Sequence, residues 1–475
     1  MLAYQLNRLD KNTRSAFPRI LYGKNEMISE IFSAYAVNER NSVIQPEVLH
    51  AAKRCFIDWF ATTTAGGVKM PAIGFQTAFA EDMDRGMARI VPTGRKATMR
   101  TATLINAAAS HTVEFDDVFG PAAYHPGTPT TSTAFSVADH LGADGLTFMR
   151  SIIIGYEIST RIAEAMGRPH YEYWHTTATN GSFGSLFSAG TLLKLNEEQF
   201  VNGLGSAGTM AAGLQQAFRE DCHGKPIHGA HAAVVGLMAA QLAKNGVTGA
   251  KNILDGPVGF GRAMSSEVDW AKSTEGLGTT YNITKITVKN HGCCGHTFPA
   301  IDAALTIKKK YNISHKDIMS VKIGMAKSTV SICGGKSHQT FFEGQFSLGF
   351  VVATAFVKGR VRLNAFEPEA LTDPIISSLA KKCEVYIDDQ VDEAFPLKRM
   401  AHLTVKLRGI ETIDFMQETR KGAPDDPMSD EELEDKYFEL VSPEVDLDIA
   451  QKLLDDIWRI EKCDNIQDLY IAPNR

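Results

Sequence analysis

From about residue 27 to residue 265, the chain has the pattern of one helix after another, and these predicted helices are rich in small residues. In EVLHAAKRCFIDWFATTTAGG (47–67), Cys55, Phe56, Trp59 and Phe60 fall three to four residues apart, and the segment ends on the glycine pair expected after a helix. Glycine lowers helix propensity, so its frequency in NGSFGSLFSAGTLL (180–193) indicates helices that pack closely in a compact core. The same periodicity predicts helices at about 98–118, 131–142, 147–166, 181–194, 197–218 and 229–245.

Near residue 280 the pattern changes to short segments in which apolar and polar residues alternate. These segments are rich in β-branched residues and predict strands at 281–289, 317–326, 383–391 and 402–409. Helix-like segments lie between them at 296–312 and 346–359. After an acidic connector, 421–437, the stretch 448–460 is helical again.

A chain of 475 residues is too long for one ordinary core, so two domains are expected and three are possible. We predict a mainly α fold in which residues 27–275 form the first part of a large helical domain and residues 276–420 form a smaller α+β domain. If the C-terminal helical segment, 421–475, packs back on the first domain, the α+β part is an insertion.

The charge and cysteine content restrict the function and the compartment. A formal net charge of −6 argues against a nucleic-acid binder, so any anionic ligand needs a local basic cluster. The seven cysteines are scattered and contain no C-x-x-C, which is typical of a reducing compartment. Apolar stretches such as 232–243 end near twelve residues, so we expect no membrane span. We expect a cytoplasmic protein with a flexible basic leader at 1–26, or a mitochondrial one if that leader is a presequence.

The stretch VEFDDVFGPAAYHPG (113–127) brings three carboxylates close to a histidine. If the preceding helix continues to Asp117, then His111, Glu114 and Asp117 share one face, while Asp116 points elsewhere. A carboxylate on an Ala-rich face is costly to bury unless it is hydrogen-bonded or lies near a cation. His125 precedes a proline and is therefore held in an extended conformation. The stretch is either part of a site or a solvated helix end with a surface histidine.

Two further segments place histidines and cations at predicted helix starts. His175 stands just before Thr176 and Thr177, which could cap a helix whose free N–H groups face an anion, although a histidine beside a tryptophan is often simply packed. Lys225 and His228 bracket a helix that starts with proline, an arrangement suited to carboxylates or phosphates or else a solvated polar turn. Other basic residues close to this second segment are Arg219, His223 and His231.

The segment VKNHGCCGHTFPAID (288–302) lies at the predicted domain boundary. Its histidines and cysteines resemble transition-metal ligands, but their spacing matches no zinc module and no second ligand pair occurs elsewhere. Lys289 as an anion contact in a cleft between the domains is the alternative that we favour. The candidate metal ligands in this segment are His291, Cys293, Cys294 and His296.

Taken together and in order, these segments resemble the MmgE/PrpD family, which contains 2-methylcitrate dehydratase and cis-aconitate decarboxylase. The resemblance covers nearly the whole chain from about residue 28, and its pieces are 108–127, 155–166, 224–261 and 288–303. It implies a helical domain built from both ends of the chain, an inserted α+β lid domain, a cleft between them and a homodimer. It also implies catalysis without a metal or organic cofactor on small di- or tricarboxylates.

The resemblance also implies roles for individual residues. His125 would exchange a proton at the reacting carbon, His175 would be the second acid/base, and Glu114 or an adjacent aspartate would orient a neighbouring group. Lys225 and Lys289 would hold substrate carboxylates and stabilise the charge that develops when a C–H or C–COO⁻ bond breaks. Asp117 and His228 are expected to contact the substrate as well.

Three departures from the family pattern predict a changed pocket. Glu114 stands where many relatives carry aspartate, and Val118 stands where threonine or histidine is common. The stretch 326–335 lacks the tyrosine of the animal decarboxylase. These changes make an authentic cis-aconitate decarboxylase less favoured.

Three other functions stay open beside a lyase, that is, a dehydratase or decarboxylase. One is an epimerase or isomerase of a small dicarboxylate such as iminodisuccinate, and another is a non-catalytic carboxylate-binding protein. The last is a metal-dependent hydrolase that uses Asp116, Asp117 and the His/Cys segment.

Overall fold

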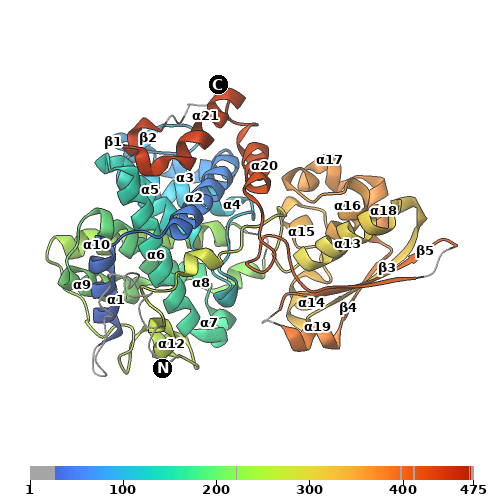
Figure 1. Ribbon diagram of the computed structural model, residues 1–475, viewed down its shortest axis with the longest axis horizontal. Helices are drawn as coiled ribbons and strands as arrows, with labels where there is room; N and C mark the ends of the chain where they lie inside the picture. The colour runs from blue at the N-terminus through green and yellow to red at the C-terminus, as the bar shows by residue number, and fades with distance from the viewer. Residues whose placement is uncertain (1–26, 221, 396–397, 410–411, 470, 472–475) are drawn as a thin grey trace, which may run out of the picture.

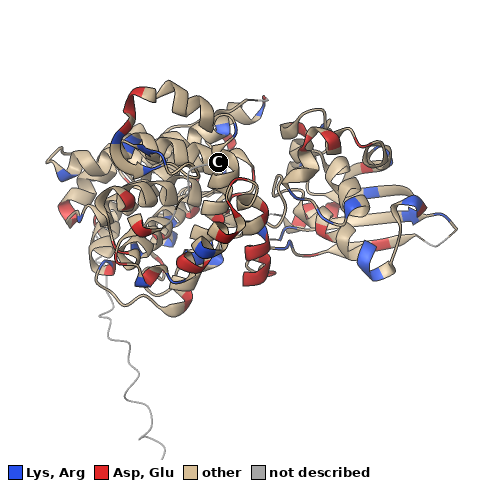
Figure 2. Ribbon diagram, turned by 90° about the horizontal axis from the view of Figure 1, so that it is seen from above, with Lys and Arg blue, Asp and Glu red and all other residues tan. Residues whose placement is uncertain are grey.

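The computed structural model describes residues 27–220, 222–395, 398–409, 412–469 and 471. The predicted basic leader, 1–26, lies outside these residues. Two bodies are visible, a larger one made mainly of helices and a smaller one that contains a four-stranded sheet (Figure 1). Seen from above, only a few chain segments cross between them (Figure 2). The mainly α fold class is confirmed.

The helical body is built around α8, which is buried along its whole length and packs against α6 and α10. Glycines allow this close packing: a Cβ on Gly236 of α10 would lie 2.4 Å from the carbonyl oxygen of Ser182. The expectation that small residues bring the helices together is therefore confirmed. The elements of this body are α1 (Ile28–Glu39), α2 (Pro46–Gly67), α3 (Ala72–Ala78), β1 (Met83–Arg89), β2 (Lys96–Ala97), α4 (Met99–Thr112), α5 (Ser132–Leu141), α6 (Gly145–Ala165), α7 (Gly167–Tyr173), α8 (Thr176–Leu192), α9 (Glu197–Met210), α10 (Gly224–Lys244), α11 (Phe260–Met264), α12 (Trp270–Thr274), α20 (Asp430–Val441) and α21 (Leu447–Trp458).

The last two of these helices come from the C-terminal end of the chain and return to the helical body (Figure 1). Tyr437 of α20 and Leu453 of α21 lie in the same apolar core as Phe56 of α2. Lys436 of α20 is fully buried and pairs with Asp58 of α2 at 2.5 Å. Burying a lysine is costly unless its charge is paired, so this contact fixes the position of α20.

The smaller body contains a four-stranded sheet in the order β4-β3-β5-β6, in which β3 and β4 are parallel and the other pairs are antiparallel. Along β5 the residues Ala401, Leu403, Val405 and Leu407 are buried alternately, as the sequence pattern predicted. These side chains share a core with α13 and α16. The elements are α13 (Phe298–Tyr311), β3 (Ile318–Met325), α14 (Lys327–Cys333), α15 (Phe341–Gln345), α16 (Leu348–Lys358), α17 (Pro368–Leu371), α18 (Pro374–Ala380), β4 (Cys383–Ile387), α19 (Asp389–Ala394), β5 (Ala401–Leu407) and β6 (Ile413–Gln417).

The structure corrects several secondary-structure predictions made from the sequence. The segment 281–289 is not a strand: it contains a 3-10 turn at Asn282–Lys285, and its one described β-bridge joins Thr287 to Val118. Its backbone is instead held against α6, where the N–H of Asn282 donates to Glu157 at 2.7 Å. The predicted helix 98–118 ends at Thr112, and the predicted helix 197–218 ends at Met210.

The predicted connector, 421–437, contains the start of α20. Ser429 and Glu432 form a capping box there, and acidic residues fill the first helical turn, which favours a helix N-terminus. The domain boundaries at 276 and 420 stay a prediction. None of the described helices combines the length and the hydropathy needed to cross a bilayer.

Candidate active site

A cavity of about 380 Å³ lies between the two bodies. Five of the residues that the sequence placed in a cleft line it: Glu114, His125, His175, Lys225 and Lys289. The other described lining residues are Val118, Ala123, Tyr171, Glu172, Gln215, Phe218, Arg219, Cys294, Gly295, His296, Ser328, Ser331, Ile332, Lys336, Phe342, Phe346, Arg399 and Arg420.

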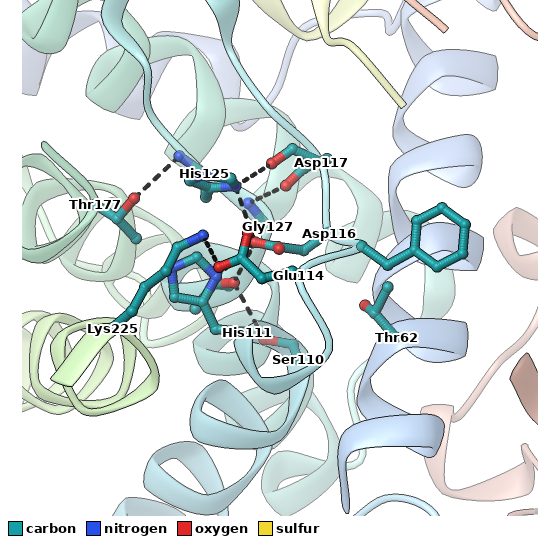
Figure 3. Close-up of polar contacts among 12 residues, drawn as sticks. Thr62, Ser110, His111, Glu114, Asp116, Asp117, His125, Gly127, Thr177 and Lys225 are labelled. Carbon is teal, nitrogen blue, oxygen red and sulfur yellow. Dashed lines mark hydrogen bonds and ion pairs between the residues drawn. The ribbon is translucent and has the colours of Figure 1, made fainter. Parts of the chain in front are cut away.

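The three carboxylates after α4 point in different directions because the helix stops before them. Glu114 has φ 56°, in the left-handed region, which costs a non-glycine residue about 1–2 kcal/mol. The prediction that Glu114 and Asp117 lie on one helix face with His111 is therefore wrong. Asp116, which was expected to point away, contacts both His111 and His125 (Figure 3).

Glu114 is the centre of a buried cluster of charges. Its carboxylate pairs with Lys225 (Figure 3). Lys289 donates to its carbonyl oxygen at 2.8 Å and to its carboxylate at 3.4 Å. Burial raises the pKa of Glu114, but Lys225 and Lys289 together lower it to about 2. Glu114 is therefore ionised at neutral pH. Burial lowers the pKa of Lys289, but the charges of Glu114 and Asp116 raise it above its usual value. An ammonium carries three donors, and the described residues accept only one from Lys225, which leaves donors for a ligand.

Two imidazoles face the same cavity, and their ring centroids are 6.5 Å apart. Burial, with the nearby charges of Lys225 and Lys289, lowers the pKa of His125 to about 4, although Asp116 opposes this. Burial and the neighbouring histidines hold the pKa of His175 well below its usual value. Both rings are therefore neutral at pH 7 in the ligand-free protein.

Local structure explains how these histidines are held. His175 is the N-cap residue of α8, and its ring packs edge-on against Phe218 with centroids 4.7 Å apart. Thr177, a cap candidate in the sequence, accepts a hydrogen bond from the backbone N–H of His125 at 3.1 Å (Figure 3). This contact joins the loop that carries His125 to the first turn of α8.

Two predicted substrate contacts lie behind the cavity wall. Asp117 accepts hydrogen bonds from the Tyr156 hydroxyl at 2.8 Å and from the Gly127 N–H at 3.0 Å. Burial, with the charges of Asp58 and Asp116, raises the pKa of Asp117 to about 8. His228 contacts His175, with 3.2 Å between their Nδ1 atoms. Neither residue is among those that line the cavity, so their predicted contact with the substrate stays a prediction that the geometry does not favour.

Three cations that the sequence did not single out complete the wall: Lys336, Arg399 and Arg420. The guanidinium of Arg399 lies 4.4 Å from the Phe395 ring centroid, and burial together with Arg420 lowers the pKa of Arg399 to about 9. Arg420 donates to the Thr287 hydroxyl at 3.2 Å. Neither arginine forms an ion pair with a described carboxylate.

The wall therefore carries a large excess of positive charge. Its described residues include two carboxylates, Glu114 and Glu172, and six cationic side chains. This excess is the local basic cluster that an acidic chain needs in order to hold an anionic ligand. The six cationic residues are Arg219, Lys225, Lys289, Lys336, Arg399 and Arg420.

The His/Cys segment does not converge on a single point. His291 pairs with Asp302 at 2.8 Å, and His296 hydrogen-bonds Thr329 at 3.1 Å. Cys293 contacts the Thr297 hydroxyl at 3.3 Å. The proposed combination of this segment with Asp116 and Asp117 in a metal site is therefore wrong.

Among the described residues, one group has the spacing to hold a metal ion: His111, Asp116 and His125. Its ligand atoms hydrogen-bond one another, and Lys289 lies 3.8 Å from Asp116. A positive charge at that distance opposes the binding of a divalent cation.

Comparisons with known proteins identify the family of the chain. The family model described as the MmgE/PrpD N-terminal domain matches residues 30–273, and the model described as the MmgE/PrpD C-terminal domain matches residues 291–460. The cis-aconitate decarboxylase-like protein oryM of Aspergillus oryzae is 24% identical over 452 residues, which cover 90% of this chain and 93% of that protein.

Two further relatives carry the name cis-aconitate decarboxylase. The Aspergillus terreus protein is 23% identical over 472 residues, covering 94% of this chain and 95% of its own. The human protein is 23% identical over 390 residues, covering 78% of this chain and 79% of its own. Because the two family models together match most of the chain, the protein belongs to the MmgE/PrpD family.

Proposed function

We propose that the protein is a lyase that acts on a small di- or tricarboxylic acid by acid/base chemistry at a carbon next to a carboxylate. The observation that carries the proposal is one cavity that combines two neutral imidazoles with an excess of cations. The names of the relatives support a lyase. The reaction that we propose uses side chains alone.

In the proposed reaction, the cations from the two bodies hold different carboxylates of one substrate. Lys225 and Lys289 stabilise the negative charge that develops at the reacting centre, while Arg399 and Arg420 hold a distant carboxylate. An arginine guanidinium is suited to this role because it can donate two parallel hydrogen bonds to one carboxylate.

Substrate binding also prepares His125 for proton transfer. Before binding, nearby ammonium groups contribute to its low pKa of about 4. An anion with two or three carboxylates reduces that positive field, so the pKa of His125 rises toward neutrality. An acid/base group is most effective when its pKa lies near the working pH. His175 is the second proton carrier in this scheme.

The choice of acid is also part of the proposal. Val118 and Glu114 both line the cavity, and both depart from the family pattern. A valine cannot hydrogen-bond a substrate hydroxyl, so we propose a related acid in place of cis-aconitate itself. The two imidazoles in one cavity are also compatible with proton exchange on two faces of a carbon, which keeps an epimerase as the alternative. We further propose that the protein is a homodimer, which sedimentation would test.

Proton NMR in deuterated buffer tests the proposal directly. The chelator-treated protein is mixed in parallel with citrate, 2-methylcitrate, cis-aconitate, trans-aconitate and an aspartate-derived imino acid. Loss of water or CO₂ supports the lyase, whereas deuterium uptake without a new product supports the epimerase. The His125→Gln variant should be inactive and the His315→Gln variant, changed far from the cavity, should be active. No reaction with any acid, in a folded protein, would overturn the proposal.

A further inference from the structure

One carboxylate behind the cavity wall joins two imidazoles. The Oδ2 atom of Asp116 lies 2.7 Å from Nδ1 of His111 and 3.0 Å from Nδ1 of His125 (Figure 3). It also accepts the Thr128 hydroxyl at 3.1 Å. His111 and Asp116 are almost fully buried, with exposed fractions of 1% and 2%. From the sequence, His111 has no predicted role in the reaction, and an aspartate next to Glu114 is only one alternative for an orienting acid.

These contacts determine which nitrogen of His125 carries the proton. Nδ1 faces two acceptors, the Asp117 carbonyl oxygen at 2.8 Å and Asp116 Oδ2 at 3.0 Å. A neutral imidazole has one N–H, and the two acceptors beside Nδ1 hold the proton on that nitrogen. The Nε2 atom of His125 bonds no described residue, so it is the nitrogen that is left to accept a proton in the cavity.

His111 has a different role from His125. Its Nδ1 donates to Asp116, and its Nε2 has no hydrogen-bond partner among the described residues. Its ring stacks on His175 with the planes 3° apart and the centroids separated by 5.8 Å. His111 therefore contacts both proposed proton carriers: its ring stacks on His175 and packs edge-on against His125 with centroids 4.9 Å apart, and Asp116 joins it to His125 as well.

We propose that Asp116 and His111 are positioning residues for the acid/base pair. Asp116 keeps the proton of His125 on Nδ1 and stabilises the imidazolium that forms when Nε2 takes a proton, and His111 holds Asp116 in place and supports the His175 ring. This inference rests on the proposed function. The other charged or titratable groups around His125 are Glu114, Asp117, His175, Lys225 and Lys289.

A pair of matched variants at residue 111 tests the inference. In His111→Asn, the amide nitrogen takes the place of Nδ1 and still donates to Asp116, whereas in His111→Gln it takes the place of Nε2 and does not. We expect His111→Asn to keep kcat within about threefold of the wild type, and His111→Gln and Asp116→Asn to lose about 10–100-fold in kcat, as is usual when a group that orients a functional histidine is removed. KM should change little, since neither residue lines the cavity.

The pH profile separates positioning from a purely structural role. Without the Asp116 charge, the imidazolium of His125 is less stable, so the limb of the kcat/KM profile that reports His125 should move to lower pH in Asp116→Asn. The melting temperatures of His111→Asn and His111→Gln control for folding. Equal activities of these two variants, or an unshifted profile in Asp116→Asn, would overturn the inference.

A measurement without substrate keeps this test separate from the proposed function. In protein labelled with ¹⁵N-histidine, NMR should show His125 as the Nδ1–H tautomer, with its signals assigned by their absence in His125→Gln. In His111→Gln this preference should weaken, even if no acid in the panel reacts. An Nε2–H tautomer in the wild type would refute the inference. Stoichiometric bound metal that is lost in Asp116→Asn would also refute it and assign the three residues to a metal site.

Discussion

Replacing Arg399 with methionine should make the protein more stable and its cavity less able to hold a carboxylate. Arg399 lies beside Arg420, and no described carboxylate pairs with either guanidinium. The positive charge of Arg399 therefore opposes folding until an anion binds. Methionine keeps an apolar contact with the Phe395 ring, because a thioether packs well against an aromatic ring.

The magnitude follows from the pKa of Arg399. A decrease from 12.5 to about 9 corresponds to about 5 kcal/mol, at about 1.4 kcal/mol for each pKa unit. Arg399 is partly exposed to the cavity, so solvent screens its charge and we take about 2 kcal/mol. Loss of the cation–π contact with Phe395 offsets about 1 kcal/mol. In a chain of 475 residues that unfolds as one unit, the net gain of about 1 kcal/mol should raise the melting temperature by about 1 °C.

Thermal melting with and without citrate measures both effects. Citrate should raise the melting temperature of the wild type, since a ligand that binds only the folded state stabilises it. In Arg399→Met, the melting temperature should start higher and rise less with citrate. Arg408→Met, which removes an exposed arginine from the same body, should behave like the wild type. A lower melting temperature for Arg399→Met, or an undiminished effect of citrate, would refute the reasoning.

Four other variants test separate parts of the structure. Glu114→Gln leaves Lys225 without its counter-charge and Lys289 with only the more distant Asp116, so it should lose about 3–5 kcal/mol in urea unfolding. Glu114→Asp should lose less, and equal losses would contradict the charge argument. Between pH 4 and its pKa of about 8, Asp117 is protonated in the folded wild type but ionised in the unfolded chain, so the free energy of unfolding falls as the pH rises across this range. The melting temperature of Asp117→Asn should therefore exceed that of the wild type at pH 8 but not at pH 4. A difference that stays constant with pH would refute this. Val118→Thr should change the preference among the acids more than the melting temperature, and an unchanged preference would remove Val118 from the substrate contacts. Gly236→Ala places a Cβ 2.4 Å from the Ser182 carbonyl oxygen and should cost about 1–3 kcal/mol, while Gly335→Ala, with no atom within 4 Å, should cost little; similar melting temperatures would argue against such close packing of α8 and α10.

Local patterns predicted the helices well, because a helix satisfies its hydrogen bonds within one segment. The predicted helices at 47–67 and 147–166 match α2 and α6 closely. The predicted strand at 281–289 failed because a strand also needs a partner, which the sequence of that segment does not contain. Its alternating residues pack on the helical body instead.

The candidate site was predictable only in part, for two physical reasons. The cavity residues Glu114, His125, His175, Lys225 and Lys289 followed from the family resemblance, but the direction of each carboxylate depends on the positive φ of Glu114, which no residue pattern specifies. Arg399 and Arg420 lie in no motif among 49 lysines and arginines. The acidic net charge indicated that a basic cluster was needed, but only the fold of the smaller body determines which residues form it.

The buried Lys436 also bears on how the protein is made. Besides its pairing with Asp58, its ammonium donates to the carbonyl oxygens of Phe115 at 2.7 Å and Lys289 at 3.0 Å. Lys436 therefore holds the segment that contains Glu114 and Phe115 against the segment that contains Lys289. A nascent chain on the ribosome lacks this contact until α20, at 430–441, has emerged, which is after every residue of the cavity wall up to Arg420. Chains that end before α20 therefore lack the contact that holds these two parts of the cavity wall together, so we expect activity only in molecules whose synthesis has passed this helix.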